Sequence, residues 1–508
     1  MDNLWKKEKG QAEYIDIFTC EKNSAFDRYI ESIKTRRNRK DNRRSTELRL
    51  KGNKLFGQEK WTEAMECYNQ SLCFAEIGSE NVALAYSNRS ACNFHMMLYK
   101  EVLVDIELAK NANLPDRLIK KLEERKNDSM KLMSSVRVER FEPKLSYESD
   151  ENFPCMANVV EIKYNEEFGR HVVAKCDIPA GRTILVENDI PHIRDDSSAC
   201  YTCMKIFTNC VACPNCPDVA FCSFDCMSRN QTHKWECGSF FNSEFEFNMK
   251  FMINTLLMAI DSFPDVNSLM QFVEDALLED PETLPTSLND SKSKYHFFLK
   301  LTTSAPYPLG TSQAYKPYEV AINLPKVSRL FDSDRKKRFF MHLVMHHTLI
   351  LSSNEFAIDD EKVLGYVSSL LNHSCAPNLV SIHSSSHMFS VTGRPIRKGE
   401  QLYTRYDTCP NGVDRQAYLK ERWGFICRCE ICEPTRAPID RKLITSDFCY
   451  KYVVKNKDNM DMTAIVQKKC IKFLNKYGHL PWSAIKNIFT IYVNHLQSMA
   501  TDQVNILV

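Results

Sequence analysis

The sequence has little net charge and no long apolar run. Its 67 Lys and Arg residues nearly balance 65 Asp and Glu residues, so a formal charge of +2 supplies no strong field for sequence-independent nucleic-acid binding. No apolar run approaches the roughly 20 residues that a membrane helix needs. Residues 1–7 lack the apolar core of a signal peptide. We therefore expect a protein that acts inside the cell without membrane attachment.

The length and the cysteine content point to several domains and to bound metal. A chain of 508 residues exceeds the roughly 100 to 200 residues of a usual domain. In a reducing compartment, clustered cysteines hold metal more often than they form disulfides. The 21 cysteines are unevenly spaced, and the clusters therefore become candidate metal sites.

A helical repeat is predicted from about residue 46 to residue 136. Small and aromatic residues recur at the spacing of a tetratricopeptide unit, first at Gly52, Ala64, Tyr68 and Ser71 and then at Ser90, Val102, Ile106 and Ala109. A third helix over residues 115–133 would cap the stack with Leu118, Leu122 and Met130 on one face. Stacked pairs of this kind form a concave peptide-binding surface. An ordinary helical bundle is the alternative.

Two segments beside these helices are polar. Residues 34–44 form a basic stretch that fits a nuclear localisation signal or the solvated entry to a helix, and its basic members are Lys34, Arg36, Arg37, Arg39, Lys40, Arg43 and Arg44. Residues 141–154 are polar and contain Pro143 and Pro154 near their ends, which predicts a linker.

A small β-domain and a helical segment follow the linker. Short β-type runs at 159–162 and 171–174 flank Phe168, Gly169 and Arg170, and a further strand at 183–186 follows a turn at 179–181. Residues 240–350 are mostly helical in pattern, with an apolar face along Phe251, Ile253, Leu256, Leu257 and Ile260.

Four closely spaced ligand pairs predict two zinc sites between residues 200 and 237. A pair with two or three residues between its members can turn both ligand atoms toward one ion, and eight ligands suffice for two tetrahedral sites. The pairs are Cys200 and Cys203, Cys213 and Cys216, Cys222 and Cys226, and His233 and Cys237. All eight ligands come from the protein, so the sites are expected to be structural. Cys210 is not one of these eight ligands. The alternative is that Cys210 binds metal in place of Cys213.

A third cysteine cluster and two further motifs lie near the C-terminal end. Cys427, Cys429 and Cys432 offer three thiolates and need a fourth ligand from elsewhere, for which Cys375 is the candidate. Cys375 stands inside the run Asn372-His373-Ser374-Cys375-Ala376-Pro377-Asn378, and a second motif runs from Gly399 to Tyr406.

The motifs, taken in order, resemble those of the SET and MYND domain protein lysine methyltransferases. The order is Phe168-Gly169-Arg170, the eight-ligand zinc segment, a helical insert, the Asn-His-Ser-Cys run, Tyr406 and the cysteine triplet. The preceding repeats are similar to those of the tetratricopeptide-bearing branch, and the resemblance covers residues 46–434. It implies an α+β multidomain protein in which a β-rich SET domain carries an inserted MYND finger.

This resemblance implies nine segments. They are a basic N-terminal segment (1–45), tetratricopeptide-like repeats (46–136), a linker (137–156), the first part of the SET domain (157–198), the MYND finger (199–238), a helical insert (239–345), the second part of the SET domain (346–410), a post-SET zinc segment (411–434) and a short C-terminal helical segment (435–508).

The resemblance also implies how three zinc ions are bound. The two sites of the finger would interleave, with Cys200, Cys203, Cys222 and Cys226 on one ion and Cys213, Cys216, His233 and Cys237 on the other. Cys375 would join Cys427, Cys429 and Cys432 on the third ion, which would fasten the post-SET segment over the active site.

The activity implied is methyl transfer from S-adenosyl-L-methionine to a lysine of a histone or non-histone protein. Such a transfer needs both reactants held close together with water excluded, and an attacking amine that has lost its proton. By resemblance, the hydroxyl of Tyr406 orients the amine. The alternative is that Tyr406 is a structural tyrosine of the core. The implied cofactor contacts are Phe168, Gly169, Arg170, Asn354, Ser369, Asn372, His373, Tyr406 and Phe425, with Asn354 on a strand before the signature.

Departures from the family pattern support a second hypothesis. His171 stands where a glycine is usual, and Trp423 replaces a second tyrosine of the lysine channel. A weak or inactive adaptor that recruits partners through its repeats and finger is therefore the alternative function. By resemblance the finger binds proline-rich peptides, and Arg49, Asn53 and Asn88 match part of a chaperone-binding carboxylate clamp. The implied location is the cytoplasm and the nucleus. A short C-terminal segment predicts a more open cleft.

Overall fold

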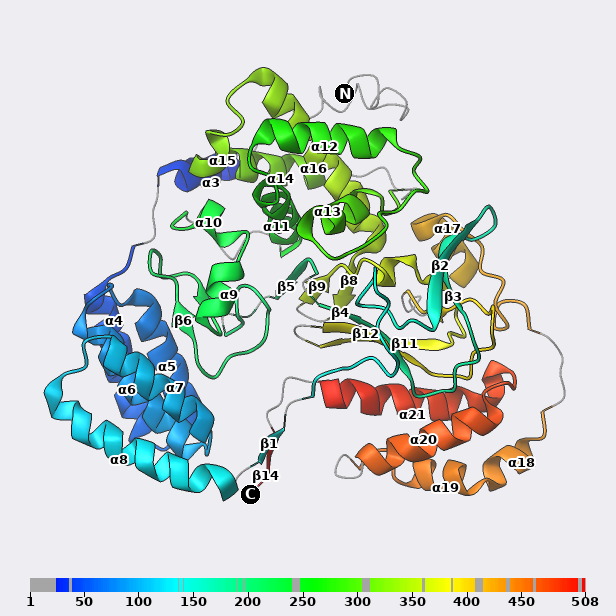
Figure 1. Cartoon of the computed structure of the whole chain (residues 1–508), viewed down its shortest axis with the longest axis horizontal. Coiled ribbons are helices and arrows are strands. Elements are labelled where there is room, and N and C mark those ends of the chain that lie inside the picture. Colours follow the sequence, from blue (N-terminus) through cyan, green and yellow to red (C-terminus); the bar gives the residue numbers. More distant parts are fainter. Residues whose placement is uncertain are drawn as a thin grey trace.

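The molecule is built around small β-sheets, with helices above, below and to one side of them (Figure 1). This computed structural model describes residues 24–507 except for 36–38, 136, 140, 189, 195, 197, 240–246, 304–310, 359–360, 385–386, 407–413, 435–438, 460–462 and 501–504. Two arginines of the basic stretch, Arg36 and Arg37, lie outside the described residues.

Five helices form the N-terminal region, each packed against its neighbour in the chain (Figure 1). They are α4 (Asn42–Phe56), α5 (Trp61–Phe74), α6 (Glu80–His95), α7 (Tyr99–Asn111) and α8 (Asp116–Leu132). Gly52 permits the close approach of α4 and α5, because a Cβ atom there would lie 2.6 Å from the ring of Tyr68. The hydroxyl of Ser45 also lies 3.0 Å from that of Ser71 across the same pair. A helical N-terminal region is thus confirmed.

A preceding helix packs elsewhere, which the sequence analysis did not predict. Helix α3 (Ser24–Thr35) lies against the helical insert rather than against the N-terminal helices (Figure 1). Its apolar residues join the main core, and they are Phe26, Tyr29, Ile30 and Ile33. This i, i+3, i+4, i+7 spacing marks one apolar helix face.

The β-structure consists of two three-stranded sheets and two short pairs that matter for the site. One sheet has the order β11 (Leu379–Ser384), β12 (His387–Thr392), β4 (Thr183–Glu187), and the other β5 (His192–Arg194), β9 (Glu361–Val363), β8 (Phe356–Ile358). A hairpin joins β2 (Val160–Asn165) to β3 (Gly169–Ala174), and β10 (Asn372–His373) pairs in parallel with β13 (Tyr403–Thr404). The runs expected at 159–162, 171–174 and 183–186 are therefore strands.

The segment predicted as a linker packs on this β-structure. Ser146 donates its amide to the carbonyl of Thr183, and Met156 forms a β-bridge with Leu185. Phe153 packs against the main core. Polar composition suggested a free linker, but three apolar side chains, Leu145, Tyr147 and Phe153, anchor it.

The helical insert lies above the sheets (Figure 1). Its helices are α11 (Phe247–Asp261), α12 (Val266–Leu278), α13 (Ser291–Leu299), α14 (Thr311–Asn323), α15 (Pro325–Ser328) and α16 (Asp334–Asn354). The five residues of the predicted apolar face on α11 are all buried in the core. The zinc-ligand segment, with β6 (Val211–Ala212), β7 (Ala220–Phe221), α9 (Phe224–Arg229) and α10 (His233–Glu236), lies between the insert and the N-terminal helices.

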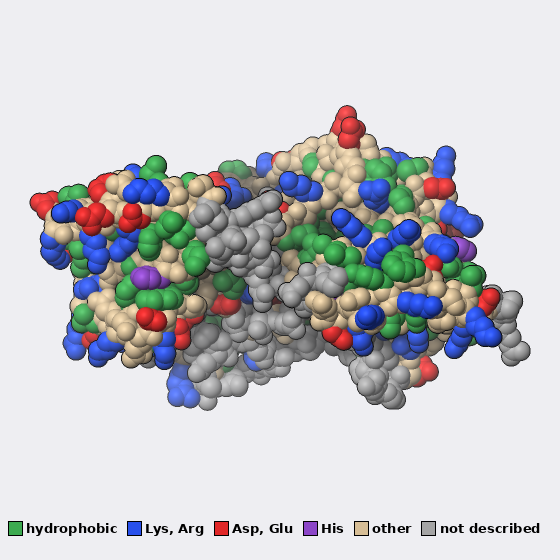
Figure 2. Space-filling model, turned by 90° about the horizontal axis from the view of Figure 1, so that it is seen from below, with side chains coloured by type: hydrophobic (Ala, Val, Ile, Leu, Met, Phe, Trp, Pro, Cys, Tyr) green, Lys and Arg blue, Asp and Glu red, His purple; other side chains and the backbone are tan. Residues whose placement is uncertain are grey.

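The C-terminal helices cover the sheet from below. Helix α17 (Arg415–Trp423) lies apart from this layer, with Leu419 packed beside Cys375 and Cys427. The helices below the sheet are α18 (Arg441–Ser446), α19 (Phe448–Lys455), α20 (Thr463–Tyr477) and α21 (Trp482–Ala500). These four helices share a core with β11 and β12, in which Cys470, Phe473 and Ile485 are buried, whereas Ile465 is exposed. Lysine and arginine side chains are spread over the face seen from below (Figure 2). Helices α19 and α20 carry the exposed lysines Lys451, Lys455, Lys468 and Lys472.

The segment that follows the N-terminal helices pairs with the C-terminal end of the described chain. Strand β1 (Arg137–Glu139) runs antiparallel to β14 (Asn505–Leu507). Among the described helices, none has the length and apolar character that a membrane crossing requires.

Candidate active site and metal centres

One cavity of about 1230 Å³ collects every residue predicted to contact the cofactor. Stretches far apart in the sequence line it, among them the β2–β3 turn, the end of α16, the segment 368–378 and the residues 423–430. The predicted residues on its wall are Phe168, Gly169, Arg170, Asn354, Ser369, Asn372, His373, Tyr406 and Phe425. Their individual roles remain predictions.

The β2–β3 turn meets the Asn-His-Ser-Cys run at one end of the cavity. The side-chain amide of Asn372 donates to the carbonyl of Phe168 over 3.1 Å. Gly169 has a φ of +62°, a left-handed conformation that side chains with a Cβ rarely adopt. His171 Nδ1 lies 2.8 Å from the Gly169 carbonyl. His171 is buried, so its side chain braces the turn and leaves the backbone of Gly169 open to the cavity.

The parallel pairing of β10 with β13 brings His373 to Tyr406. The register places His373 opposite Thr404, and the backbone amide of Tyr406 donates to His373 Nδ1 over 3.1 Å. Burial lowers the pKa of His373 to about 4, so the ring is neutral and can accept this bond. His373 therefore fixes the backbone that carries Tyr406.

Three aromatic rings surround that of Tyr406. The ring centroids of His373, Trp423 and Phe425 lie 5.3, 5.4 and 6.2 Å from the Tyr406 centroid. Burial raises the pKa of the Tyr406 hydroxyl above its ordinary value, so the hydroxyl stays protonated at neutral pH. This aromatic box (His373, Tyr406, Trp423 and Phe425) forms an apolar wall around a phenol.

Asn354 and Ser369 use some of their polar atoms within the fold. Asn354 is the last residue of α16 rather than part of a strand, which corrects the expectation. Its amide nitrogen lies 2.8 Å from the carbonyls of both Ile350 and Thr302, so its donors already serve the helix end. Ser369 donates to the carbonyl of Gly365.

Several wall residues were not predicted from the sequence. Arg170 lies 3.6 Å from Glu282 of the insert. Arg394 contacts Glu430 at 2.5 Å and donates to the carbonyl of Gly478. Arg394 therefore links the C-terminal helices to the segment that carries Cys427, Cys429 and Cys432. These pairs are more than 30 residues apart in the sequence and have no local signal. His479 also lines the cavity, so the C-terminal segment contributes to the wall.

A buried glutamate supports the wall from behind. The carboxylate of Glu187 accepts the backbone amides of Val367 and Ser368, each over 2.9 Å. Burial raises the pKa of this carboxyl, and the two amide bonds oppose that effect. Glu187 thus anchors the turn from which the Asn-His-Ser-Cys run begins.

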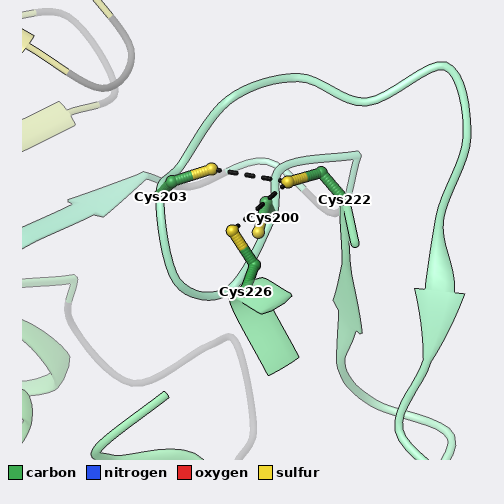
Figure 3. A group of neighbouring side chains, drawn as sticks. All are labelled: Cys200, Cys203, Cys222 and Cys226. Carbon is green, nitrogen blue, oxygen red and sulfur yellow. Dashed lines mark hydrogen bonds between the residues drawn. The ribbon is translucent and has the colours of Figure 1, made fainter. Parts of the chain in front are cut away.

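Eight of the predicted zinc ligands form two groups, each able to hold a metal ion. Cys200, Cys203, Cys222 and Cys226 converge in one group (Figure 3). Its Cys203–Cys222 and Cys222–Cys226 sulfur distances are 3.7 and 3.4 Å. Zinc–sulfur bonds of about 2.3 Å place sulfurs about 3.7 Å apart in a tetrahedron. The group therefore fits zinc.

The second group consists of Cys213, Cys216, His233 and Cys237. His233 Nε2 lies 3.2 and 3.5 Å from the sulfurs of Cys213 and Cys216, and the sulfurs of Cys213 and Cys237 lie 3.7 Å apart. The alternation of ligand pairs along the chain is the one that the resemblance implies.

Cys210 belongs to neither group. Its sulfur lies 3.1 Å from the Arg89 guanidinium and 3.4 Å from the side-chain oxygen of Asn69. Cys213 rather than Cys210 therefore stands with the second group. Cys210 instead contacts the N-terminal helices.

The third group joins Cys375 to Cys427, Cys429 and Cys432. The Cys375 sulfur lies 4.0 Å from that of Cys427 and 3.7 Å from that of Cys432. His373 Nε2 lies 3.3 Å from the Cys375 sulfur, so one imidazole touches both this group and the backbone of Tyr406. The nineteen cysteines of the described chain are all free of disulfides.

Comparison with known families matches the SET domain to residues 169–407. The Protein-lysine N-methyltransferase SMYD4 of Danio rerio is 23% identical over 222 residues, covering 38% of this chain and 29% of that protein. The mouse SMYD4 is 22% identical, covering 77% of this chain and 67% of its own. A SET and MYND domain-containing protein of Dictyostelium discoideum is 23% identical, with 56% and 84% covered.

A solved structure titled the SET domain of LSMT bound to lysine and AdoHcy is 14% identical, with a TM-score of 0.28, and covers 67% of this chain and 84% of its own. The match to the zebrafish relative spans less than a third of that protein's length. The chain contains a SET domain and is a homologue of the SET and MYND domain-containing proteins, among them lysine methyltransferases named SMYD4.

Proposed function

We propose that the chain is a protein-lysine N-methyltransferase that uses S-adenosyl-L-methionine. The observation that carries this proposal is the aromatic box around Tyr406, which shares one cavity with all nine predicted cofactor contacts. The volume of about 1230 Å³ exceeds the roughly 300 to 1,000 Å³ of a usual ligand pocket. The cavity therefore has room for a nucleoside-sized cofactor and a lysine side chain together.

The aromatic box suits a lysine that must react as a neutral amine. The unperturbed lysine pKa of about 10.4 means that the side chain arrives charged. Rings of Trp423 and Phe425 beside Tyr406 offer little solvation to a charge, so entry into the box favours loss of the proton. The protonated Tyr406 hydroxyl can then hydrogen-bond the amine and orient its lone pair.

A second part of the cavity wall, which shares Phe425 with the aromatic box, suits the methyl donor. When bound, S-adenosyl-L-methionine supplies a methyl group on a positively charged sulfur. The half-buried backbone of Gly169, the side chains of Asn372 and Ser369, and the ring of Phe425 would hold its polar ends and its adenine. Asn372 already links the two segments through the Phe168 carbonyl, so the contacts are arranged before binding.

Methyl transfer to protein or peptide arrays from labelled cofactor tests the proposal. We expect incorporation into lysine side chains of at least one array member, and mass spectrometry would identify the modified residue. Saturable cofactor binding together with no transfer to any member would contradict the proposed activity.

We also propose that the N-terminal helices are tetratricopeptide repeats and that the zinc-ligand segment is a MYND finger. The close contact at Gly52 supports the first assignment, and the alternating ligand groups support the second. Asn53 of the matched clamp positions accepts bonds from both Tyr68 and Asn88 over 2.9 Å. Titration of the full chain with a C-terminal chaperone peptide and with a proline-rich peptide would test these two partner classes. A cytoplasmic and nuclear location stays a prediction, to be tested by imaging of a tagged chain.

An adaptor without methyl transfer is the second candidate. The ring centroid of Trp423 lies 5.4 Å from that of Tyr406. Trp423 carries no hydroxyl that could form a second hydrogen bond to the amine. Calorimetric titration with S-adenosyl-L-methionine separates the candidates, because an adaptor with a decayed cavity would show no saturable binding.

A further inference from the structure

Two histidines and a glutamate converge outside the cavity and outside the three cysteine groups. His192 lies on β5, Glu361 on β9 and His383 on β11. One potential ligand atom from each lies within 4.8 Å of the others. The three residues come from strands of two different sheets, so a shared ligand there would join the sheets.

The distances are those of a compact cluster. Glu361 Oε2 lies 2.6 Å from His383 Nδ1 and 3.4 Å from His192 Nε2. The two imidazole rings are nearly perpendicular, with centroids 4.7 Å apart. Tetrahedral zinc with bonds of about 2.0 to 2.1 Å spaces its nitrogen and oxygen ligands about 3.4 Å apart. A small rotation of His383 would complete that spacing.

The cluster is buried and leaves a ring nitrogen unsatisfied. The side chains of His192 and His383 are 7% and 3% exposed, and that of Glu361 is 13% exposed. Nε2 of His192 faces the Glu361 carboxylate but has no hydrogen-bond partner in the described structure. Leaving a buried polar atom without a partner is unfavourable. A bound cation would remove that cost.

The carboxylate is oriented by a further contact. Arg194 Nη1 lies 2.9 Å from Oε1 of Glu361, which leaves Oε2 turned toward the two imidazoles. Metal-binding carboxylates and imidazoles are commonly held by such outer hydrogen bonds. Lys362, the next residue along β9, is engaged by Glu355 at 2.6 Å. Arg194 is therefore the cation that balances Glu361 when no metal is bound.

We propose that His192, Glu361 and His383 bind a divalent transition-metal ion, with zinc as the physiological occupant. Two imidazoles and one carboxylate form a ligand set typical of zinc, and a water molecule can take the fourth position. Glu361 follows the β8 strand, whose first residue Phe356 lines the cavity. The ion therefore braces a wall of the cavity, and its role is structural. The proposal does not depend on the proposed methyl transfer.

Zinc content of the purified full-length chain tests the proposal. The double variant His192→Gln/His383→Gln should hold one zinc fewer per chain than the wild type. His296→Gln is the matched control, because His296 also contacts a glutamate, Glu279 at 2.8 Å, but belongs to no such group among the described residues. The control should keep the wild-type content. Equal zinc content in the double variant and the wild type would overturn the proposal.

Cobalt substitution gives a spectroscopic readout that also reports whether the double variant is folded. Cobalt at the cysteine groups has thiolate charge-transfer bands, whereas cobalt at this site should add visible bands without them. We expect the double variant to lose only the visible bands of cobalt without thiolate ligands. Retained thiolate charge-transfer bands would show that the variant is folded. If the wild type shows no cobalt without thiolate ligands, the cluster is an ion pair with Arg194 and binds no metal.

Discussion

Replacing Asp105 with alanine tests how the N-terminal helices are held to the zinc-ligand segment. Arg89 of α6 and Asp105 of α7 are both fully buried, and their closest atoms lie 2.6 Å apart. The same guanidinium donates over 3.1 Å to the carbonyl of Cys210, and Asn93 reaches Asn209 over 2.8 Å. The pair therefore lies where the two regions share one core.

The expected loss follows from what remains after the substitution. Asp105→Ala would leave Arg89 charged, buried and without its carboxylate. Removing one partner of a buried ion pair typically costs about 3 to 5 kcal/mol. The double variant Arg89→Met/Asp105→Leu removes both charges, so we expect it to lose less stability than Asp105→Ala alone.

Native-state hydrogen exchange measures this effect where it occurs. The free energy of opening for the amides of α6 and α7 should fall by about 3 to 5 kcal/mol in Asp105→Ala. Glu80→Ala is the control, because Glu80 and Arg117 form an exposed pair worth about 0 to 1 kcal/mol. A loss below about 1 kcal/mol in Asp105→Ala, or an equal loss in the double variant, would refute the reasoning.

Three further predictions concern single buried positions and can be checked by thermal and urea unfolding of the full chain. Gly52→Ala should cost about 1 to 3 kcal/mol, because the new Cβ would lie 2.6 Å from the Tyr68 ring, whereas Gly57→Ala, with no atom nearer than 3.6 Å, should be close to neutral. Equal effects of the two would contradict the close packing at Gly52. Glu187→Gln should cost about 1 to 3 kcal/mol, because an amide group would face a backbone N–H that the carboxylate now accepts; unchanged stability would show that this anchor is dispensable. Burial holds the pKa of His347 well below 6.5, so the unfolded state takes up a proton first as the pH falls. The buried neutral His347 therefore contributes fully to the free energy of unfolding above about pH 6.5. Below that pH the free energy of unfolding falls by up to about 1.4 kcal/mol per pH unit. Thr255, Tyr295 and His346 surround this ring, and His347→Gln should flatten the slope; an unaltered slope would assign it to other groups.

The spacing of residues in the sequence was enough to predict which side chains bind metal, and the family resemblance predicted how they divide into groups and which residues share the cavity. Ligand pairs with two or three residues between their members converge because a short turn orients both side chains alike. Likewise, the Asn372–Asn378 run and Tyr406 meet because β10 pairs with β13. The pattern on Phe26, Tyr29, Ile30 and Ile33 would have predicted α3, but nothing local says which surface it covers.

Contacts between distant segments could not be predicted in this way. Arg89 and Cys210 are 121 residues apart, and His192, Glu361 and His383 come from three strands with unrelated spacing. Asn354 was expected on a strand because Asn354-Glu355-Phe356 resembles the family's Asn-x-Phe strand, yet it ends α16, where its side-chain amide donates to the carbonyl of Thr302. In each case the deciding interaction is tertiary, so the residue type alone carried no signal.

Turnover of the Tyr406→Phe variant is the most direct test of the central claim. The substitution removes one hydroxyl and keeps the ring that packs against Trp423 and Phe425. We predict that methyl transfer to a substrate lysine falls by at least about tenfold, which corresponds to about 1.4 kcal/mol in the barrier, while the affinity for S-adenosyl-L-methionine changes little. Unchanged turnover in Tyr406→Phe would contradict the assignment of this hydroxyl to the reacting amine.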